Sequence, residues 1–136
     1  AFDVTDCSTQ RNLDDRGREQ ARRIGAAFRA RGQSFDVVLT SQWCRCRETA
    51  ALLDLGPVLE ADALNSFFQQ WDQRGPRTAQ ATALLSARSD RPFVVTHQVN
   101  IRALTGETTR SGEVLVVRQA EAGFEVVGRV LIDPPQ

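Results

Sequence analysis

The sequence predicts an α/β fold in which helices cover both faces of a mostly parallel β-sheet. Two observations predict it. Stretches with helical spacing alternate with short apolar runs rich in β-branched residues, a pattern typical of parallel strands buried on both faces. The chain then closes with two longer strand-like runs joined by a Gly-containing turn, which indicates an antiparallel hairpin. We therefore expect a three-layer α/β/α architecture with a closing hairpin that makes the sheet mixed, in a single domain over residues 1–136.

The first half of the chain supplies two helices and the first buried strand. Residues 1–12 are polar and predict a loop. A helix begins near Asp14, a good N-cap, and ends near Arg31, with Gly32 following its last turn. The buried stripe of this helix has i, i+3, i+4, i+7 spacing and comprises Ala21, Ile24, Gly25 and Phe28. A strand over 35–40, a helix over 44–53 and a short strand at 58–59 follow.

The second half continues the alternation. Residues 60–75 lack a clean period and predict a loop or a short helix. Pro76 suits the first turn of a third helix that runs to Ala87. A second buried strand over 92–96 ends at His97, and a short helix over 99–104 is closed by Gly106. The hairpin comprises strands over 113–119 and 124–131 with a turn over 120–123, and residues 133–136 form a tail.

Composition and charge exclude several classes of function. Seventeen cationic and seventeen acidic side chains give a net charge of zero, which argues against a broad surface for nucleic acid or anionic membrane. No apolar run approaches the ~20 residues of a membrane helix. Every cation is Arg, so a Lys nucleophile, Schiff base or P-loop lysine is excluded. An anion site must therefore use Arg, His or backbone N–H groups.

Polar side chains follow the two buried strands where they end. Ser41 follows the first strand, and His97, the sole histidine, follows the second. Ligands of open α/β sheets bind outside the carboxyl ends of the strands, so these residues are expected to border a site. A helix starts just after His97, and its free N–H groups favour an anion beside the imidazole.

Three arginines are candidates for the same edge of the sheet. Arg45 and Arg47 lie at the start of the helix that follows the first strand. At i, i+2 they point in different directions, so only one is expected to face the site. Arg11, in the polar loop, is placed to fold over the same edge. The structural alternative for each is a solvated surface arginine.

Three segments of the chain carry a resemblance to a known family. Residues 13–21, Leu-Asp-Asp-Arg-Gly-Arg-Glu-Gln-Ala, are similar to Leu-Thr-x-x-Gly-x-x-Gln-Ala. Residues 40–50, Thr-Ser-Gln-Trp-Cys-Arg-Cys-Arg-Glu-Thr-Ala, are similar to Ser-Ser-Pro-x-x-Arg-Ala-x-x-Thr-Ala. Residues 94–97, Val-Val-Thr-His, precede Gly112-Glu113 and a strand. In order and spacing they resemble the histidine phosphatase superfamily, also called phosphoglycerate-mutase-like, and residues 6–13 and 99–101 suggest a bacterial subgroup.

The resemblance implies a phosphatase that needs no cofactor or metal. It aligns Arg45 with the family's pocket arginine and His97 with its second histidine. From their places at the same edge of the sheet, Arg11, Ser41 and Gln98 are expected to add contacts with phosphate. A planar Arg fork and an imidazole together supply donors to the phosphoryl oxygens. The implied substrate is a phosphorylated small molecule or a phosphoprotein. The family's nucleophile is a different histidine, in an Arg-His segment that ends the first strand, and water hydrolyses the phosphohistidine formed there.

That Arg-His segment is missing from these residues. His97 is the sole histidine, no apolar strand precedes Asp3, and the chain has no Met. We expect that the sequence as given lacks its natural N-terminal strand. A protein that had truly lost this strand would leave the neighbouring strands with unpaired edges, and it should not keep the rest of the fold so well. The alternative is a phosphate-ligand binding or regulatory module on the same scaffold without catalysis.

The general acid is also unassigned. Many relatives place a Glu two residues after a Leu, whereas here Leu64 is followed by Asn65 and Ser66. The remaining candidates, each also typical of a surface carboxylate, are Glu60, Asp62 and Asp72. Without a strong acid in these residues, either the substrate has a good leaving group or the acid comes from the missing N-terminal part.

Three cysteines leave a choice between a disulfide and free thiols. Cys44 and Cys46 are separated by one residue on a predicted helix, which does not suit zinc, and neither has the Arg six positions later that a cysteine phosphatase needs. A disulfide from Cys7 is plausible because the loop and this helix border the same site. Cys46 occupies the family's small buried Ala position, so Cys44 is the better partner. That pairing favours an oxidising compartment, the bacterial periplasm; the alternative is three reduced thiols in the cytoplasm.

Overall fold

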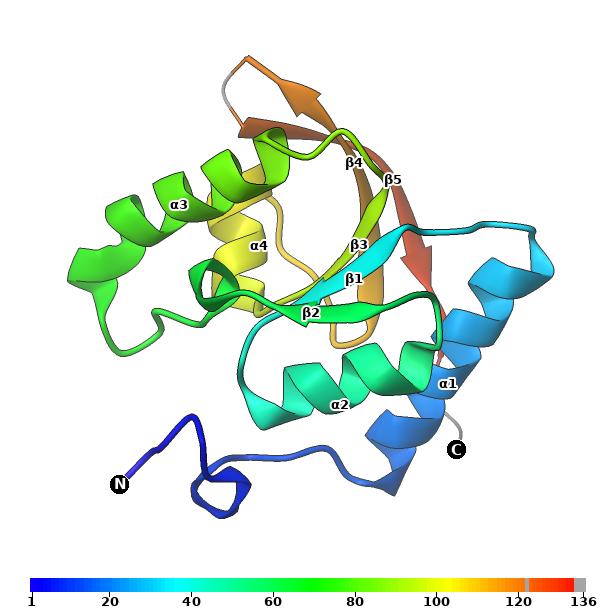
Figure 1. Cartoon of the computed structure of the whole chain (residues 1–136), viewed down its shortest axis with the longest axis horizontal. Helices are drawn as coiled ribbons and strands as arrows, with labels where there is room; N and C mark the ends of the chain where they lie inside the picture. Colours follow the sequence, from blue (N-terminus) through cyan, green and yellow to red (C-terminus); the bar gives the residue numbers. More distant parts are fainter. Residues whose placement is uncertain (122, 134–136) are drawn as a thin grey trace.

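A three-stranded parallel sheet with strand order β2-β1-β3 forms the middle layer of the protein (Figure 1). The computed structural model describes residues 1–121 and 123–133. The central strand β1 (Val37–Thr40) pairs in parallel with β2 (Val58–Glu60) on one side and with β3 (Pro92–Val95) on the other. Helices cover both faces, so the predicted three-layer α/β/α class is confirmed.

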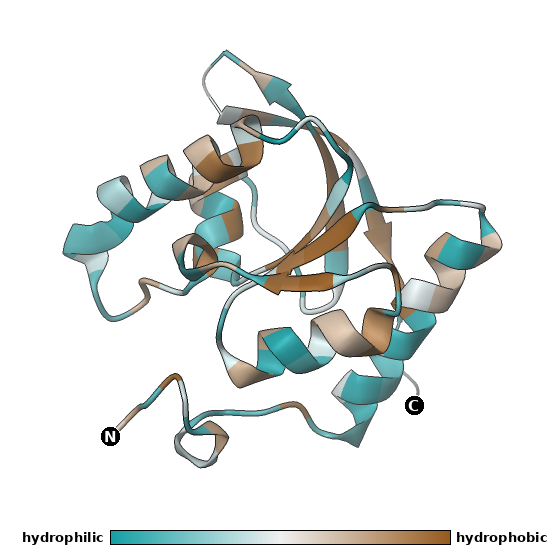
Figure 2. Cartoon of the chain, viewed as in Figure 1, coloured by the Kyte–Doolittle hydropathy of each residue, from teal (hydrophilic) through white to brown (hydrophobic). Residues whose placement is uncertain are grey.

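The two faces of β1 bury different side chains against different helices. Val38 packs in a cluster with residues of α1 (Asp15–Ala30) and α2 (Cys44–Leu53). Val37 and Leu39 pack on the opposite face with residues of α3 (Arg74–Ser86) and α4 (Gln98–Thr105). All four residues of the strand are buried. Alternation along a strand covered on both sides explains why its sequence is a continuous apolar run, drawn brown in Figure 2.

The predicted helix boundaries agree closely with the structure. The Asp14 side chain accepts a hydrogen bond from the Gly17 N–H at the start of α1, and Gly32 follows its end with φ +70°. Gly106 closes α4 with φ +78°. Pro76 lies in the first turn of α3, which begins two residues earlier at Arg74. Local capping chemistry therefore sets these ends.

The segment between β2 and α3 contains two short 3-10 helices, η2 (Asp62–Leu64) and η3 (Trp71–Gln73), where the sequence predicts a loop or a short helix. Leu64 and Phe67 are fully buried and anchor the segment to the body of the protein. Phe68 and Trp71 remain exposed. The irregular spacing of buried and exposed aromatic residues explains the absence of a clean period.

The closing hairpin forms its own two-stranded sheet, whereas the sequence predicts that it joins the parallel one. Strands β4 (Glu113–Ala120) and β5 (Gly123–Leu131) pair antiparallel with each other. The hairpin joins the core through side chains, because Val114 and Ile132 pack against the cluster under α1 and α2. Val116 in its outer half is exposed, and over the described residues neither strand of the hairpin pairs with the parallel sheet. Residue 122 of the predicted turn and residues 134–136 of the predicted tail lie outside the described residues.

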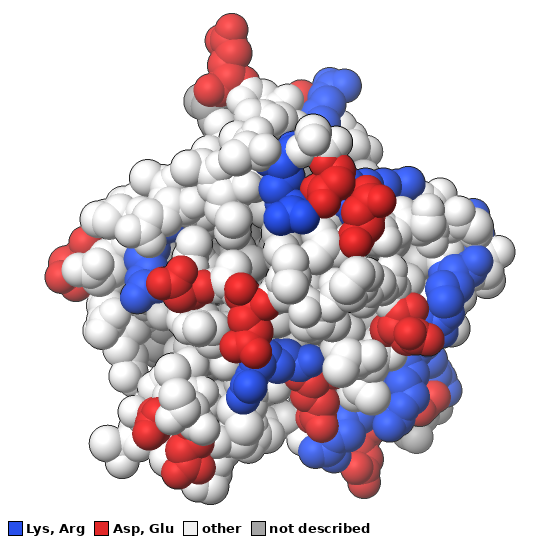
Figure 3. Space-filling model, in the orientation of Figure 1, with Lys and Arg blue, Asp and Glu red and all other residues white. Residues whose placement is uncertain are grey.

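Charges of both signs are interspersed over the face of the molecule drawn in Figure 3, and no large patch of one sign covers that face. This distribution agrees with the net charge of zero. In the part of the chain that the structure describes, no helix has the length and apolar character needed to cross a bilayer.

Helices α1 and α2 approach closely at Gly25. A Cβ atom placed there would lie 1.9 Å from the Leu53 carbonyl oxygen. Arg29 on the next turn of α1 donates hydrogen bonds from Nη1 to the carbonyl oxygens of Leu53 and Asp54, at 2.6 and 2.8 Å. These donors satisfy carbonyl groups left open at the end of α2.

We predict that Gly25→Ala destabilises the fold, because the added methyl group must push α1 away from the backbone of α2. The expected loss in the free energy of unfolding is about 1–3 kcal/mol, measured by urea denaturation. Gly75→Ala is the matched control, since a Cβ atom at Gly75 meets nothing within 4 Å. Equal destabilisation by the two substitutions would contradict the close approach.

Candidate active site

The carboxyl ends of β1 and β3 bring Ser41 and His97 into contact. Ser41 Oγ lies 2.8 Å from His97 Nε2, and both side chains are buried. The register of the two strands sets this contact, since Thr40 lies opposite Val95 and the Ser41 N–H donates to the Val95 carbonyl at 3.0 Å. The first residues beyond the paired strands therefore meet at one point.

Arg45, in the first turn of α2, completes the cluster. Its Nη2 atom lies 3.3 Å from His97 Nδ1. Its guanidinium carbon also lies 4.8 Å from the centroid of the Trp43 ring, a cation–π contact. Trp43 in turn contacts the His97 ring edge-on, with ring centroids 4.6 Å apart. An arginine, a histidine and a tryptophan are thus in mutual contact at the end of the sheet.

The hydrogen bonds at Ser41 determine the tautomer of His97. Ser41 Oγ accepts from the Trp43 N–H at 3.2 Å and donates its own proton to Asn65 Oδ1 at 3.1 Å. His97 Nε2 must then carry a proton and donate it to Ser41 Oγ, which leaves Nδ1 to accept from Arg45. Burial, followed by the positive charge of Arg45, lowers the pKa of His97 to about 3. The imidazole is therefore neutral at physiological pH.

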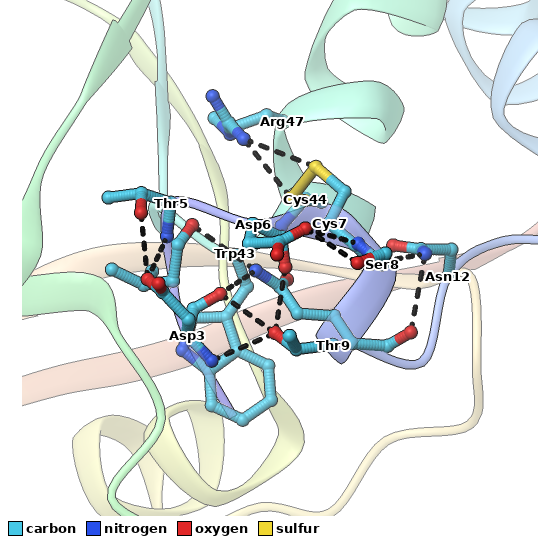
Figure 4. The surroundings of a disulfide bond; sticks show 12 residues. Asp3, Thr5, Asp6, Cys7, Ser8, Thr9, Asn12, Trp43, Cys44 and Arg47 are labelled. Carbon is cyan, nitrogen blue, oxygen red and sulfur yellow. Dashed lines mark hydrogen bonds between the residues drawn. A yellow bond between two sulfur atoms is a disulfide. The ribbon is translucent and has the colours of Figure 1, made fainter. Parts of the chain in front are cut away.

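Arg47 points away from this cluster, as the helical spacing predicts. Its Nη1 atom lies 3.9 Å from Glu60 Oε2 in a partly exposed ion pair. Its Nη2 atom donates to Cys44 Sγ at 3.1 Å. Figure 4 shows Arg47 and the Trp43 indole on opposite sides of the disulfide bond. Of the two neighbouring arginines, Arg45 alone contacts His97.

A disulfide joins Cys7 to Cys44, with Cα atoms 5.7 Å apart, and this confirms the favoured pairing (Figure 4). Two further contacts hold residues 1–12 against the start of α2. Gln10 Oε1 accepts a hydrogen bond from the Cys44 N–H at 2.8 Å, and the Phe2 ring lies 4.6 Å from the Trp43 ring. The N-terminal segment therefore packs directly beside Trp43.

Asn65 is a site residue that the motif comparison misses. Its Oδ1 atom accepts from Ser41 Oγ and from the Gln42 N–H, and its carbonyl oxygen accepts from Asn100 Nδ2 at 3.0 Å. It thereby connects the end of β1 to α4. Trp43 and Gln10 are likewise missed. The signal that could have found Asn65 is its place directly after the buried Leu64, where a polar residue needs a partner.

Arg11 and Gln98 are not brought to this cluster. Arg11 is exposed, and the Gln98 side chain donates to the Thr109 carbonyl at 2.9 Å. Their expected contacts with phosphate remain predictions. Cys46 is buried with its sulfur 3.7 Å from His97 Nε2, and burial raises its pKa to about 11, so its thiol is protonated.

The three candidate acids lie apart from Arg45 and His97. Glu60 pairs with Arg47, while Asp62 and Asp72 are exposed. Over residues 1–121 and 123–133, no carboxylate forms an ion pair with Arg45 or His97, and no three His, Cys, Asp or Glu side chains are grouped to bind a metal. The cluster combines a fixed positive charge with a neutral imidazole, an arrangement suited to binding an anion.

Comparison with known proteins gives a matching family and solved structures with the same fold. Residues 5–83 match the family model described as histidine phosphatase superfamily (branch 1). The structure of the Agrobacterium tumefaciens protein assigned as the phosphohistidine phosphatase SixA superposes with a TM-score of 0.67 at 17% identity, over 90% of this chain and 84% of that one. A protein histidine phosphatase SixA complexed with tungstate superposes with a TM-score of 0.65 at 18% identity, over 96% and 90%. No curated protein sequence matches the chain.

We predict that His97 gives no imidazole titration between pH 5 and pH 8 in the free protein, because its lowered pKa of about 3 keeps the ring neutral there. As the sole histidine, it gives a single set of ring signals for NMR. The unfolded chain binds this proton at the ordinary pKa near 6.5, so the free energy of unfolding decreases as pH falls from about 6.5 toward 3. A midpoint near pH 6.5 in the folded, ligand-free protein would contradict the assignment.

Proposed function

Because this chain belongs to the histidine phosphatase superfamily, we propose that it is a phosphatase that acts through a phosphohistidine intermediate. The observation that carries the proposal is the contact between Arg45 and the buried His97 at the ends of two adjacent parallel strands. In this proposal both side chains bind the phosphoryl group that is transferred.

Each group has a distinct part in binding. Arg45 donates a pair of N–H groups to phosphoryl oxygens and stays charged at every accessible pH. His97 is neutral in the free protein, and an arriving phosphate dianion favours its protonated form, so that Nδ1 gains a proton and becomes a second donor. The start of α4, directly after His97, adds the favourable field of a helix N-terminus. Charge on the transferred group is then balanced from two sides.

The proposed nucleophile is a histidine outside the 136-residue sequence. His97 does not suit that part, because its Nε2 is committed to Ser41 and its Nδ1 faces the positive charge of Arg45. In the family, an Arg-His segment supplies the attacking imidazole. Its nitrogen bonds to phosphorus as the leaving group departs, and water then cleaves the phosphorus–nitrogen bond to release phosphate.

Besides His97, Ser41 contacts the amide Asn65, and no described carboxylate forms an ion pair with Arg45 or His97. This composition supports a substrate whose leaving group departs without a protein acid: a phosphorylated small molecule with a good leaving group, or a phosphoprotein. One of the structures with this fold is named as a phosphohistidine phosphatase and another as a protein histidine phosphatase, which supports the phosphoprotein. The Cys7–Cys44 disulfide supports an oxidising compartment such as a bacterial periplasm.

A phosphate-ligand binding or regulatory module is the second candidate. It is favoured by one observation: the sole histidine has hydrogen-bond contacts at both ring nitrogens.

The 136-residue chain should bind orthophosphate under either proposal and should not hydrolyse p-nitrophenyl phosphate. Turnover by this chain that is lost in His97→Ala would show that His97 itself is the nucleophile and would overturn the proposed roles. Turnover by a longer gene product with an upstream Arg-His segment decides for the phosphatase.

We predict that Arg45 and Arg47 differ sharply in their contribution to phosphate chemistry. In the protein with its nucleophile, Arg45→Ala should lower kcat/KM at least ~100-fold, as the loss of a donor that stabilises transition-state charge does. Arg47→Ala is the matched control, since Arg47 contacts Glu60 and the disulfide. In the 136-residue chain, calorimetry with orthophosphate should show that Arg45→Ala weakens binding more than Arg47→Ala does. Equal losses from the two substitutions would contradict the assignment of Arg45.

A further inference from the structure

Trp43 contacts both proposed phosphate-binding side chains, although it stands at a position that the family motif leaves variable. Its ring lies 4.6 Å from the His97 ring, at an interplanar angle of 66°, and 4.8 Å from the guanidinium carbon of Arg45. As the N-cap residue of α2 it makes no side-chain capping bond. Helix capping therefore does not explain why a tryptophan stands at this position.

Contacts with the N-terminal segment and with Ser41 also hold Trp43 in place. The Phe2 ring packs on it at 4.6 Å, its backbone N–H donates to Ser41 Oγ, and the next residue, Cys44, carries the disulfide to Cys7. Trp71, the other tryptophan, is 59% exposed and packs with Phe67 and Phe68. Trp43 is thus a tethered ring inside the cluster, whereas Trp71 is a surface ring outside it.

We propose that Trp43 is a positioning residue that holds Arg45 beside His97 while an oxyanion is bound. The inference rests on the proposed phosphate site. In the free protein, Arg45 is held by donating to the bare Nδ1 of His97 at 3.3 Å and by the Trp43 ring. Once His97 takes up a proton, Nδ1 no longer accepts a hydrogen bond and the two cations repel.

The electron-rich face of the indole still attracts the guanidinium after that protonation, and this attraction strengthens where water is excluded. The T-shaped contact between the Trp43 and His97 rings does not use the lone pair of Nδ1, so it persists when that nitrogen is protonated. Trp43 therefore restrains a flexible arginine in the state in which its hydrogen bond to His97 is lost. Arg45 then remains directed at the oxyanion without the entropy cost of ordering a free side chain.

The test compares three variants of the 136-residue chain with the unchanged protein, using orthophosphate as the probe in calorimetry and NMR of the His97 ring. Trp43→Leu fills space without a π-face and should bind orthophosphate roughly tenfold more weakly. Trp43→Phe retains a ring and should recover affinity to within about threefold of the unchanged protein. Trp71→Leu, the matched control, should bind as the unchanged protein does.

A second readout needs no substitution at Trp43. In Trp71→Phe, Trp43 is the sole tryptophan, so its fluorescence should change as orthophosphate saturates the site. Unchanged fluorescence at saturation, or equal affinity of Trp43→Leu and the unchanged protein, would overturn the positioning role alone. A loss in Trp43→Phe as large as that in Trp43→Leu would do the same. Failure of the unchanged protein to bind orthophosphate would overturn the proposed function and, with it, this inference.

Discussion

Ser41 Oγ and His97 Nε2 lie 2.8 Å apart because β1 and β3 are adjacent parallel strands in one register. The Ser41 hydroxyl accepts from His97 and from the Trp43 backbone, and donates to Asn65. Its hydrogen-bonding capacity is then filled, which fixes both the tautomer and the orientation of the imidazole. The position of the lone pair at Nδ1, and hence the contact with Arg45, follows from that network. A shift in register would disconnect all of these groups together.

The site combines two groups that oppose each other electrostatically. A buried imidazole beside an arginine is stable while it is neutral, because its unprotonated Nδ1 can then accept a hydrogen bond from Arg45. In the proposed phosphate site, a bound anion would reverse this balance, since it makes the protonated ring favourable. Under that proposal the free protein holds the pair in a state of lower charge that a dianion converts into two donors. Burial lowers the pKa of His97, and the same low polarity would strengthen the interaction of the protonated ring with an anion.

Local chemistry in the sequence predicts much of this arrangement. Asp14, Gly32 and Gly106 mark helix ends because capping depends on neighbouring residues. The helical repeat separates Arg45 from Arg47, and strand ends place Ser41 and His97 at one edge. Contacts between distant segments are different. Asn65 lies 24 residues from Ser41 in the sequence, and Phe2 is likewise distant in sequence from Trp43, so no local pattern predicts which partner each residue contacts. The hairpin is another such case, because strand spacing predicts a pair of strands but not the sheet that they join.

The disulfide between Cys7 and Cys44 also implies an order of events as the chain matures. Three cysteines allow three different single bridges, and Cys46 lies only two residues beyond the correct partner. In the folded helix its side chain is turned about 200° from Cys44 and is buried near His97. Once α2 has formed and packed, Cys44 is the cysteine that Cys7 can reach. The helix thereby selects among the possible bridges, and an oxidant that acts before α2 is packed meets two chemically equivalent thiols.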